Sequence, residues 1–77
     1  MQRYGESLKL WRTDNNLTQI DLSEKTGIPQ ATISWIETDQ GVASIQQCVI
    51  LADYYGISID ELIGREIPPT KTIKKNL

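Results

Sequence analysis

The sequence predicts an all-α protein that folds as a compact bundle of four to five short helices. Apolar residues recur at helical spacing, as in Tyr4, Leu8 and Trp11 near the start of the chain. Serine or threonine residues that suit helix N-caps precede several such segments, and glycines that suit helix ends follow them. No stretch shows the alternation of apolar and polar residues expected of a strand. Together these features favour helices throughout.

The first two helices are expected within the first third of the chain. The stripe of apolar residues places the first helix over residues 4–15, where turn-prone Asp and Asn residues end it. Thr18 is suited to the N-cap of a second helix that runs to residue 26. Gly27 follows, and glycine readily takes the left-handed conformation that ends a helix. A short helix and a tight turn are therefore predicted here.

Three further helices follow the same rules. Pro29 suits the first turn of a third helix over residues 29–37, because its missing N–H costs nothing there. Ser44 is a candidate N-cap for a fourth helix, with Gln47 three residues later as a weak capping box. Glycines close this helix near residue 56 and a last short helix over 58–64. The apolar residues of these helices are Ile33, Ile36, Ile45, Cys48, Val49, Leu51, Ala52, Tyr55, Ile59, Leu62 and Ile63.

Composition excludes several classes of protein. The chain has 77 residues, no histidine and one cysteine, Cys48, which is expected to be a small buried apolar residue. An internal disulfide, a zinc site and a Ser-His or Cys-His catalytic pair are thus ruled out, so no enzyme activity and no cofactor are expected. No apolar run is long enough to cross a membrane, and no signal-peptide pattern is visible. A single domain in the cytoplasm is the expectation.

Charge is distributed unevenly along the chain. Residues 1–64 carry four basic side chains against nine acidic ones, a net charge of −5. Residues 65–77 carry four basic side chains against one acidic one, a net charge of +3. We therefore expect a folded domain over 1–64 and a basic, flexible tail over 65–77. The tail either contacts DNA as an arm, binds another partner, or only keeps the chain soluble.

The segment 18–37 reads as a short helix, a turn and a second short helix, which is the pattern of a helix-turn-helix. Over residues 5–64 the chain resembles the phage-repressor and Cro-type family, also called the xenobiotic-response-element type. The residues that carry the resemblance are Arg12, Leu17, Thr18, Gln19, Leu22, Gly27, Ile28, Pro29, Gln30, Thr32, Ile33, Ser34, Ile36, Glu37, Ser44, Leu51, Ala52, Gly56, Ile57, Ser58, Asp60, Glu61 and Leu62. The resemblance implies a lambda-repressor-like bundle, binding of double-stranded DNA as a homodimer, and control of transcription.

The resemblance also implies roles for individual residues. Gln19 stands where the family contacts a phosphate and braces the reading helix. Gln30 stands at the start of that helix, where an amide can pair with adenine. Arg12 and Glu37 stand where the family forms a partly buried ion pair between the first and third helices. The candidate DNA-contacting residues are Thr18, Gln19, Gln30, Ala31, Thr32, Ser34, Trp35, Gln40 and Ser44.

Two departures from the family pattern stand out. Trp35 replaces a residue that is more often polar or basic. It can pack on thymine methyls or a base step, form a protein-binding hot spot, or fold back on the helical surface. The loop 38–41 lacks the usual basic residues, and Asp39 within it would repel a nearby phosphate. DNA affinity is therefore expected to be modest unless the tail contributes.

Three functions remain open at this point. The first is a DNA-binding regulator, a repressor on a palindromic operator, with the helix 29–37 in the major groove. The second is a protein-interaction module that presents Trp35 and its acidic surroundings; the missing basic patch favours it. The third is an antitoxin-like regulator that binds both DNA and a protein. For a dimer, one of Tyr54 and Tyr55 is expected at the contact together with residues such as Ile57, Ile59 and Ile63.

Overall fold

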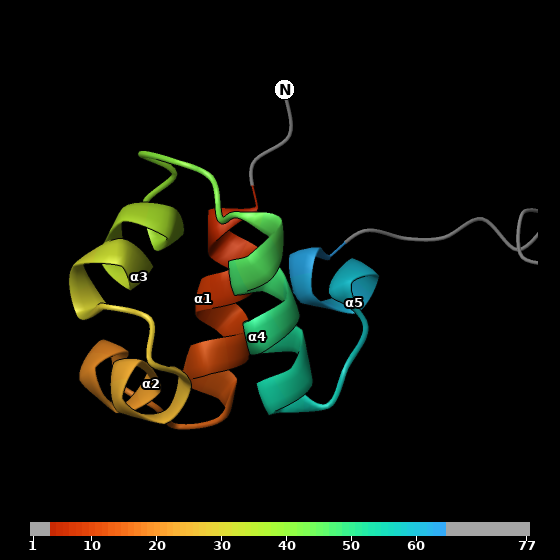
Figure 1. Ribbon diagram of the computed structural model, residues 1–77, viewed down its shortest axis with the longest axis horizontal. Coiled ribbons are helices and arrows are strands. Elements are labelled where there is room, and N and C mark those ends of the chain that lie inside the picture. The colour runs from red at the N-terminus through yellow and green to blue at the C-terminus, as the bar shows by residue number, and fades with distance from the viewer. Residues whose placement is uncertain (1–3, 65–77) are drawn as a thin grey trace, which may run out of the picture.

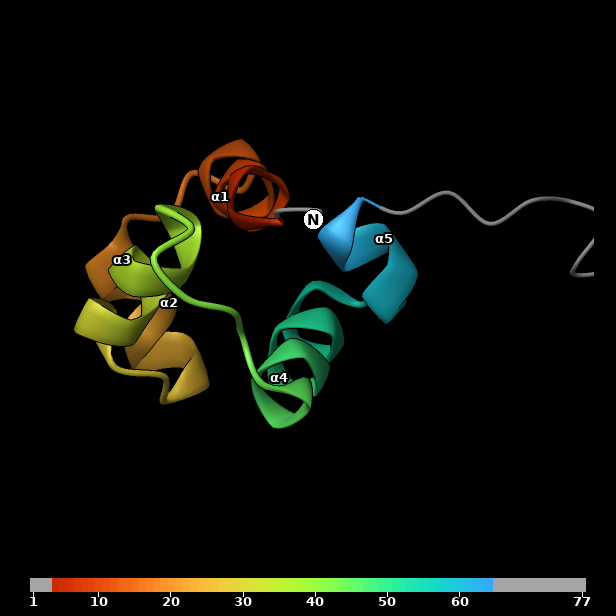
Figure 2. The same cartoon turned by 90° about the horizontal axis from the view of Figure 1, so that it is seen from above.

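The computed structural model describes residues 4–64, and within this range the chain forms five helices and no strand. Figure 1 shows the α2–α3 pair on one side of the molecule and α5 on the other, with α1 and α4 drawn between them. The view from above in Figure 2 shows that α1 and α4, which overlap in Figure 1, lie apart, and each of them contacts α5. The bounds are α1 Gly5–Asp14, α2 Gln19–Thr26, α3 Gln30–Glu37, α4 Ile45–Tyr55 and α5 Ile59–Ile63. The predicted all-α fold is confirmed.

Capping boxes begin three of the helices at the predicted N-caps. The side chains of Thr18, Ser44 and Ser58 each accept a hydrogen bond from the backbone N–H three residues later. The side chain at that later position in turn accepts from the N-cap N–H. Each box satisfies two backbone donors that a helix start leaves without partners. The predicted starts of these helices are therefore confirmed.

Gly27 sets the sharp turn between α2 and α3. Its φ of 81° lies in the left-handed region, which costs a side chain with a Cβ considerably more than glycine. Its N–H donates to the Ser23 carbonyl oxygen at 2.8 Å and so closes α2. The chain then needs only Ile28 and Pro29 before α3 begins. This turn sets the angle at which α3 leaves α2.

The predicted place of Pro29 needs a small correction. We expected it within the first turn of the third helix, but it is the N-cap, and α3 begins at Gln30. Its ψ of 142° is extended rather than helical, while its carbonyl oxygen already accepts from the N–H groups of Thr32 and Ile33. Gln30 is therefore the first helical residue, which leaves its side chain at the exposed corner of the bundle.

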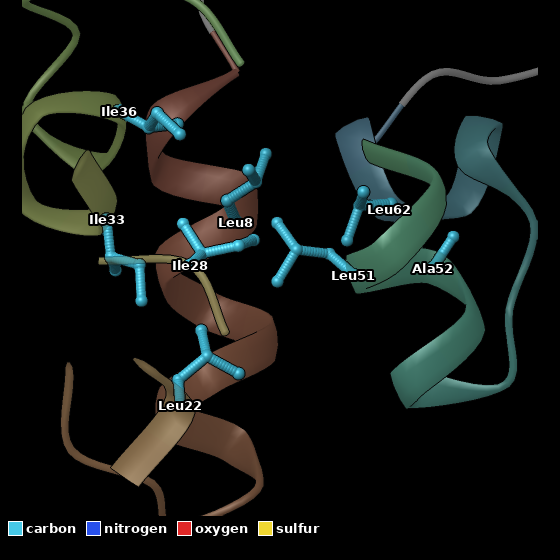
Figure 3. Packing of buried hydrophobic residues seen from close by; sticks show 8 residues of the cluster. All are labelled: Leu8, Leu22, Ile28, Ile33, Ile36, Leu51, Ala52 and Leu62. Atoms are coloured by element: carbon cyan, nitrogen blue, oxygen red, sulfur yellow. The ribbon is translucent and has the colours of Figure 1, made fainter. Parts of the chain in front are cut away.

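One apolar core joins the helices and the turn between α2 and α3, as Figure 3 shows. Leu51 of α4 points toward Leu8 of α1 and Ile28 of the turn, so the two sides of the bundle meet there. Leu62 of α5 is fully buried. The buried apolar residues are Leu8, Leu22, Ile28, Ile33, Ile36, Leu51, Ala52 and Leu62. Burial of this set is the main stabilising contribution.

Trp11, on the apolar stripe that predicts a core position in the first helix, and Cys48, expected to be buried, are both only half-buried. Trp11 uses its exposed edge to hold α5, because its indole N–H donates to the Glu61 carbonyl oxygen at 3.0 Å. Its ring also packs on that of Tyr55, with centroids 5.7 Å apart. Trp11 therefore joins α1 to α5 and α4 at the edge of the core. For Cys48, partial burial raises the pKa of the thiol.

The predicted basic tail over residues 65–77 lies outside the described residues. Within residues 4–64, no helix is both long and apolar enough to cross a membrane.

Candidate nucleic-acid interface

The predicted DNA-contacting residues lie on α3, at the start of α2 and in the loop that leads into α4. Helix α3 packs against α2 and α1 through Ile33 and Ile36, which leaves its opposite face open. Exposure varies among the candidates. Thr18, Gln30, Ala31, Trp35, Gln40 and Ser44 are exposed, whereas Gln19, Thr32 and Ser34 are partly buried. All nine thus retain some solvent-accessible surface.

A buried ion pair holds α3 against α1. The Arg12 guanidinium binds the Glu37 carboxylate through two hydrogen bonds, Nε to Oε2 at 2.7 Å and Nη2 to Oε1 at 2.8 Å. Both residues are buried, and the hydrogen bond with Glu37 raises the pKa of Arg12. Arg12 Nη1 also donates to the Leu17 carbonyl oxygen at 2.8 Å, which fixes the turn before α2. The pair therefore has a structural role in this fold.

The ion pair continues outward as a chain of hydrogen bonds to the exposed end of α3. Gln19 Nε2 donates to Glu37 Oε1 at 3.1 Å. Gln30 Nε2 donates to Gln19 Oε1 at 2.8 Å. We call Glu37, Gln19 and Gln30 the hydrogen-bond chain. All three residues are candidates from the sequence, but the contact between Gln19 and Glu37 is not predicted, because they are 18 positions apart and no local pattern joins them.

Trp35 lies against the loop after α3. A Cβ atom built on Gly41 would lie only 1.9 Å from Cζ2 and 2.0 Å from Cη2 of the indole, so the ring occupies the space that a side chain at 41 would take. The residue remains 44% exposed. Trp35 therefore packs one edge of its ring on the protein surface, as one of the three interpretations expected. Another part of the residue faces solvent.

Asp39, expected to repel phosphate, has a definite partner in the fold. Its carboxylate Oδ1 accepts a hydrogen bond from the Gly5 N–H at 3.0 Å, at the start of α1. A carboxylate is favourable at a helix N-terminus, where unpaired N–H groups carry partial positive charge. Asp39 itself adopts φ 60°, in the left-handed region. The sequence signal for this contact is weak, since 34 positions separate the two residues.

The starts of α2 and α4 differ in charge. At α2, the Asp21 carboxylate accepts from the Thr18 N–H at 3.0 Å, and this hydrogen bond lowers the pKa of Asp21. At α4, the neutral Gln47 takes the corresponding position beside Ser44, and the first turn has no acidic residue. A phosphate near α2 therefore meets a negative charge, whereas a phosphate near α4 does not.

Positive charge is scarce on the described surface. Residues 4–64 carry three basic side chains against nine acidic ones, a net charge of −6. Arg12 is buried in the ion pair, so Lys9 and Lys25 supply the exposed basic groups of this range. Phosphate contacts on this part of the chain would consequently depend mainly on neutral polar groups and backbone N–H groups.

Exposed apolar residues gather around α4 and the start of α5. Ile45 is 80% exposed and Val42 is 70% exposed, while Val49 follows Ile45 by one helical turn. Among the expected dimer residues, Tyr54 and Ile59 are also exposed. Ile57 and Ile63 are half-buried, as is Tyr55. Ile45 and Val49 belong to the apolar residues predicted for this helix, and their exposure distinguishes them from its buried residues.

Comparison with known proteins agrees with this geometry. Residues 8–62 match the model of a family described as helix-turn-helix. The chain is 32% identical over 75 residues to the uncharacterized HTH-type transcriptional regulator YobD of Bacillus subtilis, covering 96% of this chain and 67% of that protein. It is 30% identical over 63 residues to the HTH-type transcriptional activator BcrR of Enterococcus faecalis, covering 82% and 31% respectively.

A phage protein also matches. The immunity repressor protein of Bacillus phage phi105 is 29% identical over 62 residues, which cover 80% of this chain and 43% of the phage protein. This chain thus spans less than half the length of BcrR and of the phage repressor. No solved structure matches the chain. The family match over residues 8–62, together with the five-helix fold, shows that this chain belongs to the phage-repressor and Cro-type helix-turn-helix family of transcriptional regulators.

Proposed function

We propose that this protein is a repressor that binds a palindromic DNA operator as a homodimer, with α3 in the major groove. The observation that carries the proposal is the exposed amide of Gln30 at the start of α3, held at 2.8 Å by Gln19. An amide fixed at the entry of a recognition helix can form two hydrogen bonds to adenine in the major groove. Membership of the helix-turn-helix family supports the same role.

The remaining candidates divide between bases and backbone. Ala31 and the solvent-facing part of Trp35 lie on the open face of α3 and are proposed to contact base edges, including thymine methyl groups. Thr32 and Ser34 are proposed to reach phosphates or base edges from the flanks of the helix. The proposed backbone contacts come from Thr18, Gln19, Gln40 and Ser44. Ser44 is favoured among these because the first turn of α4 lacks an acidic residue.

The proposed dimer uses the apolar face around α4 and α5. Tyr54 and Ile59 are exposed at the end of α4 and the start of α5, whereas Val42 and Ile45 are exposed at the opposite end of α4. Large exposed apolar patches often mark protein contacts. In the proposed complex the two α3 helices lie about 34 Å apart, one turn of DNA, which requires a palindromic site.

We expect the DNA affinity to depend only weakly on salt concentration. With Lys9 and Lys25 as its exposed basic side chains, the part of the chain that the structure describes neutralises few phosphates. The slope of log affinity against log salt is about −0.9 for each neutralised phosphate. We therefore expect residues 4–64 to contribute a slope no steeper than about −2 for each protomer. Truncation after Gly64 tests whether residues 65–77 add to this slope.

The test is a selection from a random pool of short duplexes, followed by salt titration on the selected site. Enrichment of a palindrome, with the double variant Gln30→Ala and Trp35→Ala losing it, supports the proposal. The matched control is Gln46→Ala, which removes an exposed amide from α4 instead of α3. No enrichment at low salt, or unchanged affinity for the double variant, contradicts it. A reporter gene carrying the selected site then distinguishes repression from activation.

One observation favours a second function. The net charge of −6 over residues 4–64 and the exposed Val42 and Ile45 suit a protein partner better than a nucleic acid. A protein-interaction module, or an antitoxin-like regulator that binds DNA and a protein, would use this surface. Absence of duplex binding, together with a stable complex lost on Ile45→Asp, would favour this alternative.

A further inference from the structure

We propose that Glu37 is a positioning residue that makes Gln30 prefer adenine over guanine. Glu37 does this without touching DNA, by determining which end of the Gln19 amide faces inward and hence which end of the Gln30 amide faces the base. The inference rests on the proposed function, since it concerns the base that Gln30 reads. Its starting point is the hydrogen-bond chain, whose inner end is charged and whose outer end is exposed.

The inner end of the chain has only one possible polarity. An ionised carboxylate accepts hydrogen bonds and cannot donate them. The Glu37 side chain is 4% exposed and accepts from Arg12 Nε, Arg12 Nη2 and Gln19 Nε2. The opposite orientation of the Gln19 amide would place its carbonyl oxygen against a buried carboxylate, acceptor against acceptor. Charge-assisted hydrogen bonds are the stronger kind, so Gln19 turns its NH₂ group toward Glu37.

The orientation of the Gln19 amide determines the orientation of the Gln30 amide. Because the NH₂ group of Gln19 faces Glu37, its Oε1 atom faces Gln30. An oxygen accepts, so Gln30 must supply an N–H, as it does at 2.8 Å. Gln30 then keeps one N–H and its Oε1 for the major groove. These two groups are a donor and an acceptor side by side.

The N–H and the carbonyl oxygen that Gln30 leaves exposed select the base. Adenine presents an acceptor at N7 and a donor at N6, which complement one N–H and one carbonyl oxygen. Guanine presents acceptors at both N7 and O6, so the carbonyl oxygen of Gln30 would face an acceptor. A reversed chain would instead leave both N–H groups of Gln30 available, which suits guanine. The buried charge of Glu37 therefore makes the reversed reading unfavourable.

The binding experiment compares A·T with G·C at one position of the selected site. Gln30→Ala identifies that position as the one where base preference is lost. There, the unaltered chain is expected to prefer adenine by about tenfold or more, the equivalent of one good bidentate contact. Gln19→Met keeps a long side chain but cannot transmit the polarity, and Glu37→Gln removes the charge. In both variants the ratio of affinities for the A·T and G·C sites is expected to fall to within about threefold of one, whereas Gln46→Ala leaves this ratio unchanged.

Gln19→Met keeps the inference testable if Glu37→Gln does not fold, because the contacts between Arg12 and Glu37 do not involve Gln19. A uniform loss of affinity with the adenine preference retained would overturn the inference, since it would make Gln19 a phosphate contact only. Retention of the preference in a folded Glu37→Gln protein would overturn it equally.

A measurement without DNA separates this inference from the proposed function. In the free protein, one of the two Gln30 side-chain amide protons is hydrogen-bonded to Gln19. Its proton resonance is expected to move upfield in Gln19→Met, while the Gln46 amide protons stay in place. Unmoved Gln30 resonances would overturn the hydrogen-bond chain itself. If they move but the unaltered chain selects no duplex, the proposed function fails and the base preference fails with it.

Discussion

The α2–α3 pair and the loop over residues 38–43 are held in place by different kinds of contact. In the pair, hydrogen bonds run from the ion pair through Gln19 to Gln30. Around the loop, close approach adds to the hydrogen bond between the Gly5 N–H and Asp39: Gly5 of α1 lies against the end of α3 and Asp39, and Gly41 lies against the Trp35 ring. Hydrogen bonds specify the orientation of a group, whereas close packing specifies its position. The pair should therefore be sensitive to loss of charge, and the loop to added volume.

The largest effect is expected from breaking the ion pair. Glu37→Ala leaves the Arg12 guanidinium buried without its partner, so unfolding free energy should fall by about 3–5 kcal/mol. Urea denaturation followed by circular dichroism measures this. Glu24→Ala, at an exposed acidic residue of α2, should change stability by less than about 0.5 kcal/mol. A small effect of Glu37→Ala would show that hydrogen bonds do not dominate the α2–α3 pair.

The next effect is expected from adding one carbon at Gly5. Alanine normally favours a helix by up to about 1 kcal/mol over glycine. Here the new Cβ would lie 2.6 Å from the Ile36 carbonyl oxygen and 2.8 Å from that of Glu37, both backbone atoms. Gly5→Ala should therefore destabilise the fold by about 1–3 kcal/mol in the same urea experiment. Lys9→Ala, at an exposed position of α1, is the control, and a stabilised Gly5→Ala protein would refute the close packing.

A smaller effect is expected at Gly41, because the atoms that a Cβ would meet belong to a side chain that is able to move. Gly41→Ala should displace the Trp35 ring and cost about 1 kcal/mol, at the low end for overpacking. In a Trp35→Ala background the same change should cost almost nothing. This double-mutant cycle isolates the contact. Equal costs in both backgrounds would mean that Trp35 does not pack on the loop.

The smallest effect at neutral pH concerns a buried hydroxyl near the ion pair. The Tyr55 hydroxyl has no hydrogen-bond partner within the part of the chain that the structure describes, and burial raises the pKa of Tyr55 to about 12. Since the unfolded value is 10.0, stability should be constant below pH 10 and fall as pH rises from 10 to about 12. Tyr55→Phe should remove this alkaline loss and change stability at neutral pH by less than about 1 kcal/mol.

Thermal unfolding at successive pH values measures the alkaline loss. Tyr54→Phe, at the exposed neighbouring ring, is the matched control and should keep the loss. If Tyr55→Phe retains the full alkaline loss, the hydroxyl is not the group responsible. If it destabilises the protein strongly at neutral pH, the hydroxyl has a partner, and the polar contacts near the ion pair extend further than the hydrogen-bond chain.

Local patterns in the sequence were sufficient for the helices. Thr18, Ser44 and Ser58 cap helices as expected, because a capping box joins residues only three positions apart. The burial of Leu8, Ile33 and Leu51 follows from helical periodicity in the same way. Resemblance to a family added the contact between Arg12 and Glu37, which periodicity alone does not reveal.

Contacts between distant parts of the chain required the folded structure. Asp39 reaches Gly5, Trp35 covers Gly41, and Gln19 joins Glu37 to Gln30, although nothing in the spacing of these residues indicates it. The physical reason is the separation along the chain of the residues that each contact joins. A helix and its caps depend on neighbours within about one turn, so residue order specifies them. The orientation of an amide or a ring depends on whichever groups packing brings near it, and that is settled only when α1, α2, α3 and the loop come together.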